Sequence, residues 1–197
     1  MLKAIILRDF FSFKGEKKIK LKDGVNLLLG INGSGKSSFI NSLRILSEGI
    51  VGEGLVKLIQ EQWGGYDQVV NFNGDRKAPY AQVTYVFDYK KLNIINAMAD
   101  FKSDVYYRIT IRQSGTSYTL NERMYTEHKR RTGSSFTYLD FSNGNAMLSL
   151  TKIRYFMEST KRTLKIGNIL LCYRIKIVTL EWLKAVNNER TCKMVRR

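Results

Sequence analysis

Gly30-Ile31-Asn32-Gly33-Ser34-Gly35-Lys36-Ser37 is the stretch of sequence that decides the fold. Its inner glycines allow backbone dihedrals that a Cβ would penalise, so consecutive amides can converge on a small anion. Apolar side chains then recur at helical spacing up to about residue 46, and a helix that begins here points its unpaired amides at the same anion. The eight residues therefore predict a phosphate-binding loop, or P-loop.

Each residue type in the P-loop has a defined task. The backbone of the glycine-rich part wraps the phosphates, Lys36 directs its charge to the β- and γ-phosphates, and the Ser37 hydroxyl is placed to ligate Mg²⁺. The expected cofactors are therefore ATP and Mg²⁺, with Ser37 as the metal ligand. The residues expected to bind the nucleotide are Asn32, Gly33, Ser34, Gly35, Lys36, Ser37 and Ser38.

An acid that positions the attacking water is not readable in the sequence. Hydrolysis requires such an acid at the end of an apolar strand. Asp88 and Asp140 each end an apolar segment, but neither is followed by a second carboxylate, and we interpret both as solvated strand ends. The catalytic residues stay unknown. We expect ATP hydrolysis in the complete system and an inactive isolated chain.

Two further sets of residues are weaker candidates. Phe10, Phe11 and Phe13 precede the P-loop and could include a residue that stacks on adenine, although packing in the core or a hairpin is the preferred interpretation for most of this set. Gln62, Gln68 and Gln113 could each orient a water molecule, but glutamine in a polar loop is usually plain surface. His128 lies in a charge run, 127–131, that is typical of a solvated segment.

Strand signals surround the P-loop. Residues 2–7, 17–21 and 25–29 are expected to be strands, the last two joined at the tight turn of Lys22-Asp23-Gly24. Alternation predicts further strands over 81–87, 104–111, 117–120 and 136–141, and short helices are expected over 55–62 and 92–99. The predicted fold class is α/β, with a P-loop NTPase core and an antiparallel β subdomain.

Positive charge is concentrated late in the chain. The 197 residues carry a formal net charge of +16, and residues 151–197 contribute twelve basic and three acidic side chains, a balance of +9. Such a cluster favours a polyanionic partner, DNA in the first instance, over a plain solvated surface or an acidic protein partner. We divide the chain into a P-loop lobe, 1–150, and a basic C-terminal region, 151–197, whose fold is not readable.

Nothing in the sequence points to a membrane or an oxidising compartment. The N-terminus is interrupted by charge too early for a signal peptide, and Arg174 and Lys176 interrupt the apolar stretch 166–180. Cys172 and Cys192 lack metal-ligand spacing. A cytoplasmic protein with no membrane partner is expected.

The first fifty residues resemble the N-terminal lobe of ABC-type ATPases, in the group of RecF, SMC and OLD-like AAA-labelled proteins. The specific parts are the Asp9-Phe10-Phe11-Ser12-Phe13 approach and the Asn32-Gly33-Ser34-Gly35-Lys36-Ser37-Ser38 core. The resemblance implies an ATPase that dimerises around two nucleotides and acts on DNA in repair, chromosome maintenance or phage defence. The Leu-Ser-Gly-Gly loop and acidic strand end of that group are not visible here. The lobe is therefore expected to be incomplete and to require a second copy or a complementary lobe.

Two alternatives belong to other classes. One is a different P-loop enzyme, such as a small-molecule kinase or GTPase, although no Asn-Lys-x-Asp guanine motif is present. The other is a basic nucleic-acid-binding module whose P-loop is vestigial. Intact Lys36 and Ser37 count against the second alternative.

Overall fold

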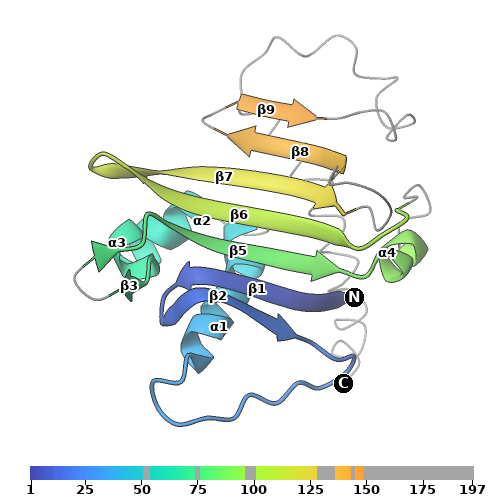
Figure 1. Ribbon diagram of the computed structural model, residues 1–197, viewed down its shortest axis with the longest axis horizontal. Helices are drawn as coiled ribbons and strands as arrows, with labels where there is room; N and C mark the ends of the chain where they lie inside the picture. The colour runs from blue at the N-terminus through green and yellow to red at the C-terminus, as the bar shows by residue number, and fades with distance from the viewer. Residues whose placement is uncertain (51–53, 74–75, 96–100, 128–135, 143–144, 149–197) are drawn as a thin grey trace, which may run out of the picture.

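One antiparallel sheet of seven strands dominates the computed structural model, which describes residues 1–50, 54–73, 76–95, 101–127, 136–142 and 145–148 (Figure 1). Its spatial order is β2-β1-β5-β6-β7-β8-β9. Strands β1 and β5 are neighbours in the sheet, although the P-loop and the helices that follow it lie between them in the sequence. The strands are β1 (Leu2–Phe10), β2 (Phe13–Lys20), β5 (Tyr80–Phe87), β6 (Val105–Ser114), β7 (Ser117–Thr126), β8 (Phe136–Ser142) and β9 (Asn145–Leu148).

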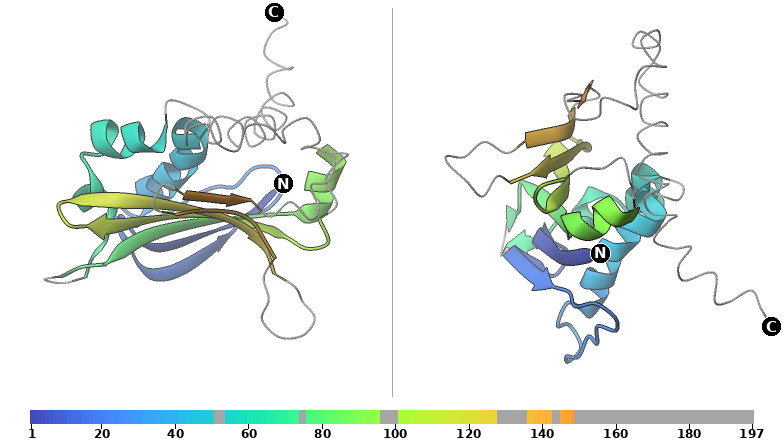
Figure 2. Two further views of the ribbon diagram at one scale, coloured as in Figure 1. Left: turned by 90° about the horizontal axis from the view of Figure 1, so that it is seen from above. Right: turned by 90° about the vertical axis from the view of Figure 1, so that its right-hand side faces the viewer.

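Short helices connect β2 to β5 and cover one face of the sheet. Figure 2 shows α1 and α2 on this face, whereas no helix of the described residues covers the opposite face. A small hairpin of β3 (Phe72–Asn73) and β4 (Arg76–Lys77) precedes β5. The helical segments are α1 (Lys36–Arg44), a π-helical turn η1 (Ile45–Ile50), α2 (Leu55–Lys57), a second π-helical turn η2 (Leu58–Gln62), α3 (Tyr66–Val69) and α4 (Tyr89–Ile95).

The hydrophobic core lies between the sheet and these helices. Alternate residues of a strand point to the same face, so the apolar positions of β1, β5 and β6 form one continuous layer. Phe39 of α1, Ile45 of η1 and Leu58 of η2 pack against it and are almost completely buried. The sheet side of the core consists of Ile5, Leu7, Ala81, Val83, Tyr85, Ile109 and Ile111.

Tyr85 joins the P-loop helix to the centre of the sheet. Its side chain is fully buried, and its hydroxyl donates a hydrogen bond of 2.5 Å to the carbonyl oxygen of Ser42 in α1. Burial raises the pKa of the Tyr85 hydroxyl well above its ordinary value, so it stays a donor. Because Ser42 is small and also buried, α1 can approach β5 closely.

Most of the predicted elements are confirmed. The strands expected over 2–7, 17–21, 81–87, 104–111, 117–120 and 136–141 correspond to β1, β2, β5, β6, β7 and β8. The helix expected over 55–62 corresponds to α2 and η2, while α4 begins at Tyr89 and not at residue 92. Asp88 explains the earlier start, because its Oδ1 accepts hydrogen bonds from the amides of Lys90 (2.9 Å) and Lys91 (3.4 Å) and so caps the helix.

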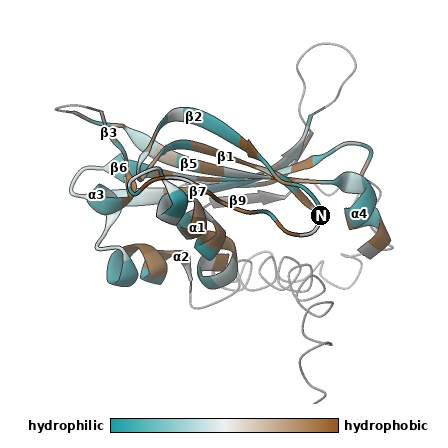
Figure 3. Ribbon diagram, turned by 90° about the horizontal axis from the view of Figure 1, so that it is seen from below, coloured by the Kyte–Doolittle hydropathy of each residue, from teal (hydrophilic) through white to brown (hydrophobic). Residues whose placement is uncertain are grey.

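The strand predicted over 25–29 is wrong. The chain leaves the sheet after β2 and runs to α1 as an irregular segment (Figure 1). Val25, Leu27 and Leu29 are 94%, 78% and 83% exposed. Figure 3 shows this hydrophobic stretch standing apart from the strands. A run of the buried-strand type needs neighbouring strands to cover it, and no described strand pairs with residues 25–29.

The hairpin predicted at Lys22-Asp23-Gly24 is also wrong, although the chain does turn there. The side chain of Asn26 closes the turn by accepting from the Lys22 amide and donating to the Lys22 carbonyl, each at 2.9 Å. Asp23 pairs with Lys91 of α4 at 2.5 Å, and this ammonium lowers the pKa of Asp23. The turn is therefore tied to α4 and not to a second strand.

The predicted α/β class holds only in part. Every pairing of the seven-stranded sheet is antiparallel, so the described residues form the antiparallel part of the prediction without a parallel P-loop core. His128 and the basic region 151–197 lie outside the described residues.

Candidate nucleotide-binding site

The P-loop forms a tight curve at the start of α1. Gly33 and Gly35 have φ values of +82° and +92°, which residues with a Cβ rarely adopt. The amide of Ser34 donates to the carbonyl of Ile31 at 3.2 Å and closes the curve. Gly35 is the N-cap of α1, and no side chain caps the helix there. The first amides of α1 are thus available to an anion.

Lys36 places its ammonium inside the curve. Its Nζ donates to the carbonyl oxygens of Gly30 at 2.6 Å and Ile31 at 2.8 Å, and lies 3.4 Å from the hydroxyl of Ser34. Three oxygen atoms of the P-loop therefore fix the position of the Lys36 ammonium. The next residue, Ser37, is exposed on the first turn of α1, so its hydroxyl is accessible to a metal ion.

Ser38 differs from the rest of the predicted set because it is buried. Its hydroxyl lies 2.8 Å from the hydroxyl of Ser12, and the amide of Ser12 donates to it at 3.4 Å. These contacts attach the turn between β1 and β2 to the P-loop helix. The structure thus brings Ser38 to the site as a link between two segments, while Asn32, Gly33 and Ser34 remain exposed.

Phe13 is the aromatic residue that lies against the P-loop. A Cβ placed on Gly35 would stand 3.1 Å from its ring, and equally 3.1 Å from the hydroxyl of Ser12. Phe10 is instead fully buried in the core, and Phe11 packs edge-on against Trp63 with ring centroids 5.2 Å apart. Core packing therefore accounts for Phe10, whereas Phe11 is only partly buried against the core and Phe13 lies against Gly35.

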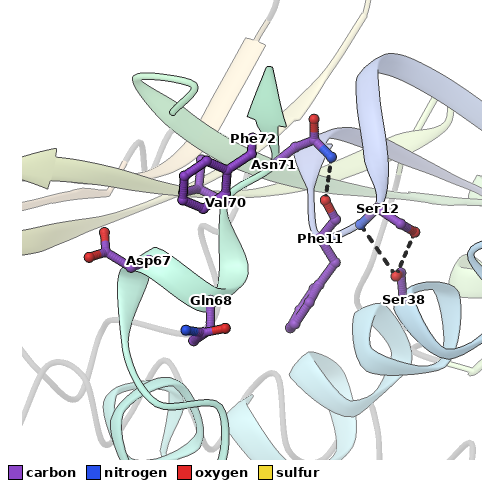
Figure 4. Close-up of a pocket in the computed structure, with 8 residues that line it drawn as sticks. All are labelled: Phe11, Ser12, Ser38, Asp67, Gln68, Val70, Asn71 and Phe72. Atoms are coloured by element: carbon purple, nitrogen blue, oxygen red, sulfur yellow. Dashed lines mark hydrogen bonds between the residues drawn. The ribbon is translucent and has the colours of Figure 1, made fainter. Parts of the chain in front are cut away.

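A hollow of about 440 Å³ opens beside the start of α1 (Figure 4). Three segments converge on it, namely the β1–β2 turn, α1 and the chain from α3 to β3. Hydrogen bonds hold them together: the Phe11 amide donates to Val69 O at 2.7 Å, and the Asn71 side chain donates to Phe11 O at 2.5 Å. Its lining consists of Phe11, Ser12, Ser38, Asp67, Gln68, Val70, Asn71 and Phe72.

The sequence pointed to only part of this hollow. Phe11, Ser38 and Gln68, which the sequence offered as candidates, lie in its lining, and Ser12 belongs to the stretch that resembles the ATPase family. Asp67 and Asn71 carry no local signal. Their proximity arises because the chain after α3 returns to the β1–β2 turn, where Phe10 and Val70 form an isolated bridge. Gln62 accepts a hydrogen bond from Arg44, and Gln113 donates to Gly115 O.

The two strand-end aspartates have structural partners. Asp88 caps α4 through the amides of Lys90 and Lys91. Asp140 lies 3.6 Å from Nε of Arg123 and accepts a hydrogen bond of 3.0 Å from the Ser142 hydroxyl. Asp88 follows the end of β5, as expected, but Asp140 lies within β8 and pairs with both neighbouring strands, so its interpretation as a strand end is wrong. The catalytic acid stays unidentified.

We predict that Gly35→Ala weakens nucleotide binding far more than Gly33→Ala does. Both substitutions introduce a Cβ at positive φ, which costs about 1–2 kcal/mol. Only at Gly35 would the new methyl group press on Phe13 and Ser12, since space at Gly33 is open. Titration calorimetry with Mg-ATP on both variants measures the difference. Equal losses would show that the close approach of Phe13 does not matter for the site.

Comparison with known proteins agrees with this geometry. The family model described as AAA domain matches residues 4–190, so the chain belongs to this family. It is also similar to the chromosome partition protein Smc of Methanococcus voltae, with 34% identity over 87 residues. That match covers 44% of this chain and 7% of the Smc protein, so the chain corresponds to a small part of its relative. The expected likeness to the N-terminal region of SMC-like P-loop ATPases is confirmed.

No helix among the described residues has the length and apolar content needed to cross a membrane.

Proposed function

We propose that this chain is the ATP-binding N-terminal lobe of an SMC/RecF-like ATPase. The observation that carries the proposal is the ammonium of Lys36, held by Gly30 O and Ile31 O within the curve of the P-loop, next to the uncapped start of α1. Backbone donors, a fixed cation and an exposed hydroxyl converge there. A nucleoside triphosphate with its magnesium ion requires this set of groups.

The residues present fit Mg-ATP. The amides from Asn32 to Lys36 would hold the phosphates, with the charge of Lys36 on the β- and γ-phosphates and the Ser37 hydroxyl on Mg²⁺. Phe13 against Gly35, and Phe11 with the polar groups of the hollow beside α1, offer surfaces for the rest of the nucleotide. When bound, ATP supplies the phosphoryl group whose transfer drives the complete system.

A complementary lobe would complete this site. Residues 25–31, which lead into the P-loop, expose five large apolar side chains, Val25, Leu27, Leu28, Leu29 and Ile31. An uncovered apolar run of this kind is typical of a surface that another polypeptide covers. We propose that a second copy or a complementary ATPase lobe covers it and supplies the catalytic acid.

We predict that the isolated chain binds Mg-ATP but releases phosphate only at background rate, because Asp67, the one carboxylate among the described residues that line the hollow, is paired with Lys77 at 2.7 Å. Calorimetry gives the binding constant, and a phosphate-release assay on the same preparation gives turnover. GTP serves as the control ligand. Turnover of about 1 s⁻¹ or more would contradict the prediction, and Asp88 and Asp140 would then be the first residues to substitute.

We infer that the complete system is cytoplasmic and acts on DNA, in repair, chromosome maintenance or phage defence. The net charge of +16 supports a polyanionic partner. The similarity to a chromosome partition protein supports the same choice.

A further inference from the structure

The sheet face that no helix of the described residues covers carries four arginines. Ile109 and Ile111 of β6 are buried in the core, so Arg108 and Arg112, which alternate with them, point to the opposite face. Arg123 of β7 pairs with Arg108 in the antiparallel register and shares its face. Arg8 of β1 alternates with the buried Leu7 and points the same way. Strands β1, β6 and β7 thus bring these residues to one surface.

Two tyrosines hold these arginines in pairs. The guanidinium carbons of Arg8 and Arg112 lie 5.2 and 5.0 Å from the centre of the Tyr80 ring. Those of Arg108 and Arg123 lie 5.0 and 5.4 Å from the centre of the Tyr125 ring. We call these groups the Tyr80 cluster and the Tyr125 cluster. Cation–π contacts limit the motion of each guanidinium, so less entropy is lost when its donors bind a partner.

Few carboxylates neutralise the two clusters. Asp9 and Asp140 approach Arg8 and Arg123 at 3.9 and 3.6 Å, and Glu16 of β2 pairs with Arg8 in the strand register. Neither Arg108 nor Arg112 has a carboxylate within 4 Å in the part of the chain that the structure describes. Lys18 and Lys20 of the edge strand β2 extend the same face, since they pair with Ile6 and Ala4 of β1. The surface therefore presents planar cationic donors in excess, which suit phosphate oxygens.

The spacing of the clusters fits a nucleic acid duplex. Arg108 and Arg112 are four residues apart on β6, and a rise of about 3.4 Å per residue separates them by roughly 14 Å. The major groove of B-form DNA is about 12 Å wide between its flanking backbones. One cluster can then contact each backbone.

We propose that the Tyr80 and Tyr125 clusters bind the phosphate backbone of duplex DNA through this face of the sheet. The residues that form this surface belong neither to the P-loop nor to the basic region 151–197. The inference rests on the proposed action on DNA and is independent of the nucleotide site.

The test is the salt dependence of DNA binding by the full chain. A labelled duplex of about 30 base pairs is titrated by fluorescence anisotropy at several salt concentrations, with wild type, R8Q/R112Q and the charge-retaining R8K/R112K. Removing one phosphate contact lowers the slope of log K against log salt by about 0.9, so R8Q/R112Q should lower it by about 1.8 and weaken binding about 30-fold at roughly 0.15 M salt. R8K/R112K should keep the wild-type slope.

The matched control is K57Q/K90Q, which removes the same charge from helices α2 and α4 and should leave the slope unchanged. Mg-ATP affinity and the circular dichroism spectrum of each variant show whether the fold and the P-loop are intact. If R8Q/R112Q binds DNA with the wild-type slope, the inference is overturned and the binding is attributed to residues 151–197. Equal binding of polyglutamate and DNA would overturn it in favour of an acidic protein partner. A wild-type chain that binds ATP and no DNA would overturn both this inference and the proposed action on DNA, while the nucleotide site would stand.

Discussion

Lys36→Ala is expected to weaken Mg-ATP binding by roughly 10- to 150-fold. The substitution removes the cation that Gly30 O and Ile31 O hold inside the P-loop. Hydrogen bonds to a charged group contribute about 1.5–3 kcal/mol, and each 1.4 kcal/mol corresponds to about a tenfold change in affinity. The fold itself should be unaffected, because the ammonium of Lys36 donates to atoms of its own loop.

Calorimetric titration of wild type, Lys36→Ala and a control measures this loss. Lys57→Ala is the control, since it removes the same charge from α2, away from the P-loop. Thermal unfolding should give the same midpoint for Lys36→Ala and wild type. Equal affinities for Lys36→Ala and wild type would refute the assignment of the P-loop as the nucleotide site.

Tyr85→Ala is expected to lower the free energy of unfolding by about 3–5 kcal/mol, as truncation of a large aromatic core residue does. Tyr85 lies at the centre of the sheet, stacks against Tyr107 with ring centroids 6.4 Å apart, and contacts α1 through its hydroxyl. The variant leaves a cavity beneath the helix that begins at the P-loop. We therefore expect nucleotide affinity to fall together with stability.

Tyr85→Phe separates the hydrogen bond from the packing. It keeps the ring and removes the donor to Ser42 O, which should cost about 1–2 kcal/mol. Urea unfolding followed by circular dichroism measures both variants. A loss below about 1 kcal/mol for Tyr85→Ala would mean that α1 does not pack on β5 in solution.

Local patterns in the sequence were sufficient for most of the described fold. Alternation predicted β6, whose buried and less buried positions alternate. The apolar and aromatic residues of β5 also predicted a strand, although it is buried on both faces from Val83 to Phe87. The P-loop predicted α1 because glycine and lysine act through their own backbone and charge. The same reasoning failed at residues 25–29. There the apolar run is typical of a buried strand, but no described strand pairs with it. Composition alone therefore could not predict the structure of these residues.

The candidate site divides in the same way. The part of the candidate site that would bind phosphate consists of eight consecutive residues, so the sequence alone predicted it. The hollow next to it depends on Asn71 reaching Phe11 across sixty positions of the chain, which no local pattern encodes. The pairing of Arg8 and Arg112 around Tyr80 likewise requires the register of three strands, β1, β5 and β6.

The exposed run at residues 25–31 has a thermodynamic consequence for any lobe that covers it. It continues directly into the P-loop, and Lys36 grips the carbonyl of Ile31 at its end. Whatever immobilises the run therefore also shapes the phosphate site. Linkage then makes the effect reciprocal: the factor by which the covering lobe tightens ATP binding equals the factor by which ATP tightens the association of the lobes. ATP concentration would thus set how much of the protein is assembled, even before any phosphate bond is broken.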